Sequence, residues 1–119
     1  MTPKEIALTA AKALDSKKGI GIQVLETASL TTLADYFVIC SAGSSTQAKA
    51  LADICEKSIK DAGEEVYHAE GHRGGTWLLL DLSSVVVHIF TEEAREFYSL
   101  ERLWSDAPAV DLTGILTEN

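Results

Sequence analysis

The segment from Thr76 to Phe90 contains two short runs of aliphatic and β-branched residues on either side of Ser83-Ser84. Two such runs joined by two small polar residues predict a β-hairpin. A two-residue loop fixes the register, which pairs Leu82 with Val85, Leu80 with Val87 and Leu78 with Ile89. Because strand side chains alternate between faces, these six residues form one aliphatic face, and we expect it to lie against the core.

The opposite face of this hairpin mixes large aromatic and polar side chains. Its members are Trp77, Leu79, Asp81, Val86, His88 and Phe90. Such a mixture is unusual in an interior, where an unpaired carboxylate at Asp81 is costly, so we expect a working surface. The alternative is a sheet covered by helices on both sides, with Trp77 and Phe90 in the core, because doubly buried strands are also almost continuously apolar.

The rest of the chain predicts helices that alternate with strands. Thr2 followed by Pro3 is typical of a helix start, and Ser44 with Gln47 has the spacing of a capping box. The expected elements are a helix over 3–17, strands over 20–26 and 35–41, a helix from Ser44 to about Asp61, a strand over 64–69, a glycine-rich loop over 70–75, the hairpin, and a short helix from Thr91.

This order predicts an α/β fold, a single domain in which helices pack on a mixed five-stranded sheet. The strand, helix and strand between 35 and 69 are typical of a crossover, so the second and third strands are expected to be parallel, with a right-handed connection. Residues 106–119 include Pro108 and no long periodic run. We therefore expect a domain over 1–107 and a loosely held tail over 108–119.

The chain has 119 residues, enough for one domain, and a formal charge of −8. This negative charge argues against direct binding to nucleic acid, because such binding requires clustered Lys and Arg. It favours a basic partner. The N-terminus lacks a long apolar segment, and no run approaches the roughly 18 apolar residues of a membrane span. We expect a soluble cytoplasmic protein without a membrane contact.

Three groups of residues are candidates for phosphate binding, metal binding or catalysis. The turn at Gly43-Ser44 resembles a phosphate-binding turn, but it lacks a Walker-type Lys and a G-x-G-x-x-G motif, and the following strand lacks a D-x-D pair for metal-dependent nucleotidyl transfer. His68 and His72 with Glu70 lack a closely spaced third metal ligand. His88 has no identifiable nucleophile beside it, so we interpret it as a polar contact. Catalysis, metal and cofactors are not expected.

Two further sets of residues have structural interpretations. Cys40 and Cys55 fall in a predicted strand and helix and are expected to be small buried hydrophobic residues. In the segment REFYSLERLW, we expect Phe97 and Leu103 to be core. Aromatic residues and Arg often dominate binding surfaces. We expect the others, Tyr98, Leu100 and Glu101, either to extend the Trp77 face or to be structural, and Arg95 to pair within its helix or with a carboxylate rather than with RNA.

Four separated blocks now stand in order: DYFVICSAGSSTQAKALAD, Glu70-Gly71, WLLLDLSSVVVHIF and REFYSLERLW. Together they resemble the ribosomal silencing factor family, also called the Iojap family, over roughly 3–107. The resemblance implies an α/β domain similar to the nucleotidyltransferase fold but without its catalytic carboxylates. One departure is Leu82-Ser83-Ser84, where the family often has an aromatic-Gly-acidic turn.

The resemblance also implies a function without catalysis. The factor is expected to bind the large ribosomal subunit through ribosomal protein fourteen, to block joining of the small subunit sterically, and so to repress translation when nutrients are short. Carried over by position, the binding residues are Glu70, Trp77, Leu79, Asp81, His88, Tyr98, Leu100 and Glu101.

Two other functions stay open from the sequence. One is a large-subunit assembly factor that uses the same face, and the other is a nucleotide-binding transferase that uses the Gly43-Ser44 turn. An exposed aromatic face is also expected to allow a homodimer when the partner is absent.

Overall fold

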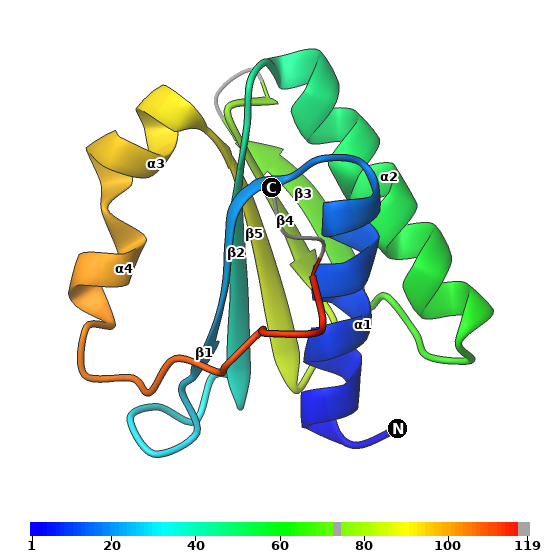
Figure 1. Ribbon diagram of the computed structural model, residues 1–119, viewed down its shortest axis with the longest axis vertical. Coiled ribbons are helices and arrows are strands. Elements are labelled where there is room, and N and C mark those ends of the chain that lie inside the picture. The colour runs from blue at the N-terminus through cyan, green and yellow to red at the C-terminus, as the bar shows by residue number, and fades with distance from the viewer. Residues whose placement is uncertain (73–74, 117–119) are drawn as a thin grey trace.

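Five strands form one sheet in the order β1-β2-β5-β4-β3, and helices lie on both of its faces (Figure 1). The computed structural model describes residues 1–72 and 75–116. The elements are α1 (Pro3–Ser16), β1 (Ile20–Glu26), β2 (Tyr36–Ala42), α2 (Ser45–Asp61), β3 (His68–His72), β4 (Trp77–Asp81), β5 (Val85–Thr91), α3 (Glu92–Tyr98) and α4 (Leu100–Leu103). β2 and β5 are parallel and the other neighbouring pairs are antiparallel, which confirms the mixed sheet.

The two long helices begin where the sequence predicts. The Thr2 side chain accepts a hydrogen bond from the Glu5 N–H, and the Thr2 N–H donates to the Glu5 side chain, which completes a capping box at α1. Ser44 Oγ caps α2 by accepting from the Gln47 N–H at 3.1 Å. Within the described ranges, no helix has the length and apolar character that a membrane crossing requires.

The hairpin has the predicted register. Leu80 is opposite Val87 and Leu78 is opposite Ile89, while the Leu82 N–H donates to the Val85 carbonyl at 2.8 Å. The two-residue loop requires a left-handed residue, and Ser83 supplies it with φ of 71°. The hairpin therefore presents its aliphatic residues to one side of the sheet, as expected.

The third strand differs from the expectation. It was predicted over 64–69, but it begins at His68 and continues to His72, into the predicted glycine-rich loop, of which residues 73 and 74 lie outside the described part. The reason is pairing, because β3 runs only where β4 offers partners, from Asp81 opposite His68 to Trp77 opposite His72. β2 and β3 are parallel, as predicted, but β5 and β4 lie between them.

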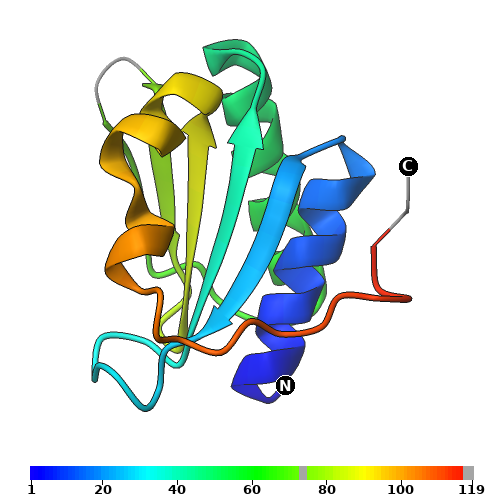
Figure 2. The same cartoon turned by 60° about the vertical axis from the view of Figure 1, so that its left-hand side comes forward.

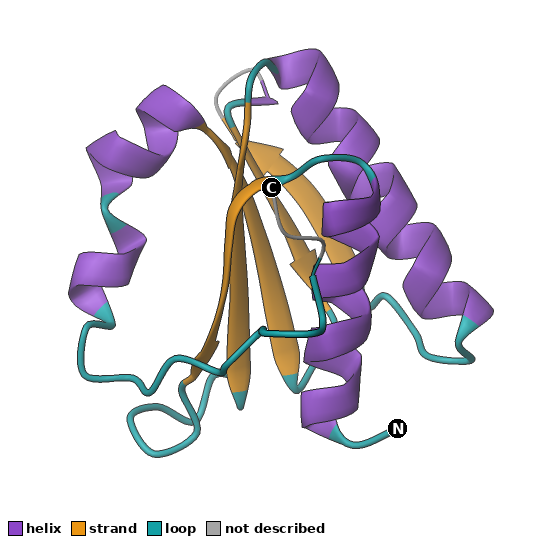
Figure 3. Cartoon of the chain, viewed as in Figure 1, coloured by secondary structure: helices purple, strands orange, loops and turns teal. Residues whose placement is uncertain are grey.

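The helices divide into two unequal layers (Figure 3). α1 and α2 cover one face, which we call the aliphatic face, and α3 and α4 cover part of the other, which we call the aromatic face. The aliphatic core includes Leu14, Leu51, Leu80, Val85, Val87 and Ile89. The aromatic core is smaller and is formed by Leu25, Ala34, Phe37, Ile39, Phe90, Ala94 and Ala107.

The segment after α4 is held against the sheet, so the expectation of a loose tail from Asp106 is wrong for residues 106–116. The Glu26 N–H donates to the Pro108 carbonyl and the Val110 N–H donates to the Val24 carbonyl, both at 2.8 Å. This segment crosses beside β1 (Figure 2), and Ala107 is buried. A single β-bridge has no periodicity that a sequence pattern can reveal. Residues 117–119 lie outside the described part.

Candidate partner-binding surface

The aromatic face consists of a covered half and an open half. On β2 and β5, Phe37, His88 and Phe90 are buried beneath the α3–α4 segment. On β4 and β3, Leu79 and Asp81 are partly exposed, and His68 and Glu70 are exposed. Cross-strand pairing brings Glu70 opposite Leu79 and His68 opposite Asp81. We call these four residues the open shelf.

Trp77 lies at the boundary between the two halves. Its ring centroid is 4.8 Å from that of Tyr98 on α3 and 5.0 Å from that of Phe90. The indole Nε1–H donates to His88 Nδ1 at 3.2 Å. The ring is only partly exposed, so the expectation of a fully open aromatic platform is wrong at this position. Trp77 packs against Tyr98 and Phe90 with part of its ring and exposes the rest to solvent.

His88 is buried, with 5% of its surface exposed, so the expectation that it is an outward polar contact is wrong. Burial lowers the pKa of His88 to about 4, which keeps the imidazole neutral at physiological pH. Nδ1 accepts from Trp77, and Nε2 is buried with no hydrogen-bond partner among the described residues. The geometry assigns His88 the task of orienting the Trp77 indole.

The Asp81 carboxylate is neither fully buried nor without a hydrogen-bond partner. It is partly exposed, and its Oδ1 accepts from the Ser83 N–H at 2.8 Å, which stabilises the hairpin turn. Glu70 is exposed, and its carboxylate lies 3.0 Å from His68 Nε2. The open shelf therefore carries two carboxylates beside Leu79, and this half of the face is accessible.

α3 and α4 are anchored by Arg95. Its guanidinium donates to Glu101 at 3.1 Å, to the Ile20 carbonyl at 3.2 Å and to Ser41 Oγ at 3.0 Å, which confirms carboxylate pairing. Gly21 makes room for this arm, since its φ is +58° and a Cβ would meet Arg95 Nη1 at 3.0 Å. Glu101 thus serves the internal structure of the helix pair.

Two residues of the α3–α4 segment are exposed where the sequence predicted burial. Phe97 and Leu103 were expected in the core, but they are 79% and 76% exposed. Tyr98 and Leu100 instead pack partly buried against the aromatic core. The cause is Ser99, which adopts a left-handed conformation with φ of 47° and ends α3, so one helical period does not run through the segment. Phe97 and Leu103 are surface residues that the pattern did not identify.

The Gly43-Ser44 turn is occupied by its own helix. The Gly43 N–H donates to Gln47 Oε1 at 2.6 Å, and Ser44 Oγ accepts from the Gln47 N–H. Gln47 therefore satisfies a donor that a phosphate would need. This arrangement gives the turn a structural role as a helix cap.

Metal and thiol chemistry find no support in the described part of the chain. No group of three His, Cys, Asp or Glu residues there could hold a metal ion, and the side chain of His72 lies outside the described part. Cys40 and Cys55 are free and buried, as expected. Burial raises the pKa of both thiols to about 12, so neither forms a reactive thiolate near neutral pH.

With this geometry in view, comparison with known proteins identifies the family. Residues 1–119 match the family described as "Ribosomal silencing factor during starvation". The chain belongs to this family. It is 37% identical to ribosomal silencing factor RsfS of Halalkalibacterium halodurans over 98% of this chain and 100% of the relative. It is 39% identical to RsfS of Bacillus subtilis over 94% and 95%.

Solved structures agree with this assignment. A crystal structure of a Chromobacterium violaceum protein superposes with a TM-score of 0.85 at 37% identity, over 88% of each chain. More distant similarity reaches the maize chloroplast protein Iojap and a mouse protein named for mitochondrial assembly of the ribosomal large subunit. The family resemblance expected from the sequence is thus confirmed, and the names of the relatives indicate a regulatory, ribosome-associated role.

Proposed function

We propose that this protein binds ribosomal protein fourteen of the large subunit and sterically blocks association of the small subunit, which represses translation under nutrient limitation. Family membership supports the ribosomal partner. The formal charge of −8 suits a basic protein surface rather than bare RNA. Steric blocking requires affinity and bulk but no turnover, so the proposed activity is not enzymatic, and we place it in the cytoplasm.

The observation that carries this proposal is the half-open aromatic face. A covered half gives Trp77 a fixed position against Tyr98 and Phe90, and the open shelf beside it offers Leu79 between acidic groups. Rigid aromatic anchors next to a polar rim are typical of interfaces whose binding energy is concentrated in a few residues.

The eight expected site residues divide by position into three roles. Glu70, Trp77, Leu79 and Asp81 are proposed as direct contacts, because they reach the surface. Tyr98, Leu100 and Glu101 are proposed at the margin, where they also hold the helix pair. His88 is proposed to act through Trp77, because it is itself buried.

Co-sedimentation with purified large subunits tests the proposal. Leu79→Ala and Trp77→Ala should each reduce the bound fraction strongly, with the Trp77 change larger, since truncation of an aromatic anchor costs about 2 kcal/mol or more. Leu33→Ala is the matched control for Leu79→Ala, because Leu33 is exposed and lies outside the open shelf. Circular dichroism must show that each variant is folded. Undiminished sedimentation of both the Leu79 and the Trp77 variant would refute the proposed surface.

A second candidate function is assembly of the large subunit, which the printed name of the mouse relative favours. The two are separated by adding the protein to mature, purified subunits and measuring their association. A blocking factor prevents association of mature subunits, whereas a pure assembly factor leaves it unchanged.

The same shelf is proposed to pair two copies of the chain when the ribosomal partner is absent, because it exposes apolar surface. Sedimentation equilibrium with and without Leu79→Ala measures this pairing. A monomer at all concentrations contradicts it without affecting the ribosomal proposal.

A further inference from the structure

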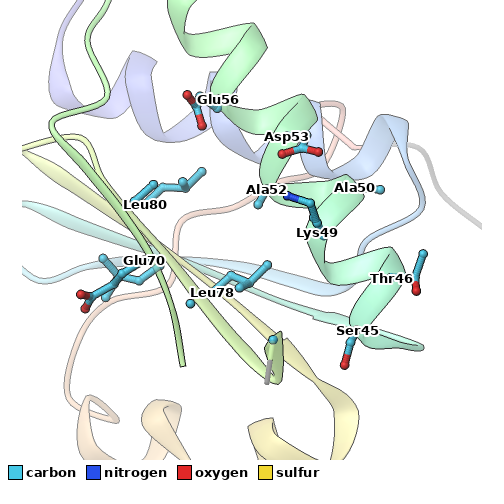
Figure 4. Close-up of a pocket in the computed structure, with 14 residues that line it drawn as sticks. Ser45, Thr46, Lys49, Ala50, Ala52, Asp53, Glu56, Glu70, Leu78 and Leu80 are labelled. Carbon is cyan, nitrogen blue, oxygen red and sulfur yellow. The ribbon is translucent and has the colours of Figure 1, made fainter. Parts of the chain in front are cut away.

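A groove of about 690 Å³ lies on the aliphatic side of the sheet, between α2 and the strands β3 and β4. Leu78 and Leu80 extend from β4 toward α2 and form its apolar floor (Figure 4). Its rim along α2 carries Lys49, Asp53 and Glu56. The floor of the groove faces the opposite side of the sheet from the open shelf, although Glu70 and Leu79 of the shelf also line the groove at the strand edge.

The edge strand leaves this groove open from the side. Ala69 is opposite Leu80 and Gly71 is opposite Leu78, so both face the groove with minimal side chains. Both are exposed. A Cβ at Gly71 would lie 2.9 Å from Leu78 Cδ2, so a larger residue there would displace the end of the Leu78 side chain.

β3 also has a backbone edge available for pairing. Among the described strands, it pairs only with β4, whereas the outer edge of β1 is hydrogen-bonded to Pro108 and Val110. An edge strand directs a row of N–H and C=O groups outward, which is the template for addition of an extended peptide. The groove beneath this edge is where alternate side chains of such a peptide would lie.

The charges of the rim favour a cationic occupant. Asp53 is exposed, and it has no hydrogen bond or ion pair to a described residue, while Glu56 is bound by Lys60 at 2.8 Å. Lys49 is the cation of the groove lining. With a net charge of −8 on the whole chain, the local and the overall fields both attract a positive segment.

We propose that this groove receives an extended basic peptide segment of a partner, which adds beside β3 as a sixth strand. Every second residue of this strand faces the groove: aliphatic side chains at these positions pack on Leu78 and Leu80, and cationic side chains at other groove-facing positions lie near Asp53 and Glu56. Strands pair about 4.8 Å apart and side chains on one face recur about every 6.8 Å, so five residues match the length of β3. This site does not require the proposed function, because its floor of Leu78 and Leu80 faces the opposite side of the sheet from the shelf side chains, although both sites share the β3 edge.

The probe is an acetylated and amidated peptide of two Thr-Val-Thr-Lys repeats, in which Val and Lys share one strand face, titrated into ¹⁵N-labelled full-length protein. Amide signals of residues 68–71 and of the groove side of α2 should shift, and those of α3 across the sheet should shift less. The same peptide with alternate N-methyl groups on its pairing edge should bind at least about tenfold more weakly, because it lacks strand hydrogen bonds. Equal binding of the methylated peptide would overturn the strand-addition mode.

Charge neutralisation tests the partner chemistry. Asp53→Asn with Glu56→Gln should weaken binding about tenfold, since two partly solvated ion pairs are lost. Asp61→Asn with Glu65→Gln is the control, because it removes the same charge from exposed positions outside the groove, and it should change affinity less than about twofold. Equal losses in both variants would show an attraction by net charge alone and overturn the site.

Blocking the groove gives an independent result. Ala69→Phe places a large side chain on the exposed edge strand over Leu80 and should abolish peptide binding while retaining co-sedimentation with large subunits. Loss of co-sedimentation would show that the groove and the shelf are not separate sites. A dimer that the peptide dissociates would assign the groove to a second copy of the chain instead of a basic segment.

Discussion

The two faces of the sheet are covered to different extents, and the difference follows from the helices that each face receives. The aliphatic face is covered by two helices of 14 and 17 residues, while the aromatic face is covered by helices of seven and four residues. The long helices bury a continuous core. The short pair covers only the β2–β5 half, so the β3–β4 half stays accessible beside a fixed Trp77. One sheet thus combines stability on one side with a surface on the other.

The largest expected effect contrasts equal truncations on the two faces. Leu51→Ala beneath the aliphatic face should lower the free energy of unfolding by about 4 kcal/mol, because the residue is fully buried and the cavity cannot fill. Leu100→Ala beside the aromatic face should cost about 1 to 2 kcal/mol, since Leu100 is only partly buried. Urea unfolding measures both. Equal costs would contradict the unequal layers.

The second effect concerns pH. His88 has an ordinary pKa of 6.5 when unfolded and about 4 when folded, so the unfolded state binds the proton first as pH falls. Stability should therefore decrease between about pH 6.5 and pH 4, by up to roughly 3 kcal/mol from this group. The difference in unfolding free energy between the wild type and His88→Gln, followed across this range, isolates the contribution. If the difference in unfolding free energy does not change with pH, the His88 imidazole is exposed to solvent instead of buried.

The third effect tests how α3 and α4 are attached. Arg95→Gln should destabilise the protein by about 2 kcal/mol, because a largely buried guanidinium loses Glu101, Ser41 and the Ile20 carbonyl. Arg95→Lys keeps the charge but not the fork of donors, and should recover only part of the loss. Hydrogen exchange should rise in α3 before it rises in α1. Uniform exchange would show that the short layer is not separately anchored.

The smallest effect has the opposite sign. Ser83→Gly should stabilise the hairpin by about 0.5 to 1 kcal/mol, because Ser83 has a positive φ that Gly adopts without strain. Ser84→Gly is the matched control and should not stabilise, since Ser84 is not among the residues with positive φ. Thermal unfolding distinguishes the two. A Tm that rises equally for both variants would assign the gain to something other than backbone strain.

The sequence was most informative where a period is long enough to count. Alternation in the hairpin placed Leu80 opposite Val87, and the spacing of Thr2 and Glu5 located the start of α1. Alternation also assigned His88 to the correct face of the sheet. It could not show that a helix covers that position, because coverage depends on residues that are distant along the chain.

The errors occurred where local conformation interrupts a period. Ser99 turns the chain between α3 and α4, so Phe97 is exposed to solvent and Tyr98 packs against the aromatic core. The β-bridge between Leu25 and Ala109 is a single pair, too short to leave a pattern. Alternation therefore predicted which side chains share the aromatic face, and the division of that face into exposed and buried residues required the fold.

The pairing of Pro108 and Val110 with β1 has a consequence for self-assembly. A sheet that is sealed at one border accepts a neighbour only at the other. Two copies joined through β3 would leave only the sealed borders outermost in the described chain, so growth would stop at a closed pair instead of continuing into a filament.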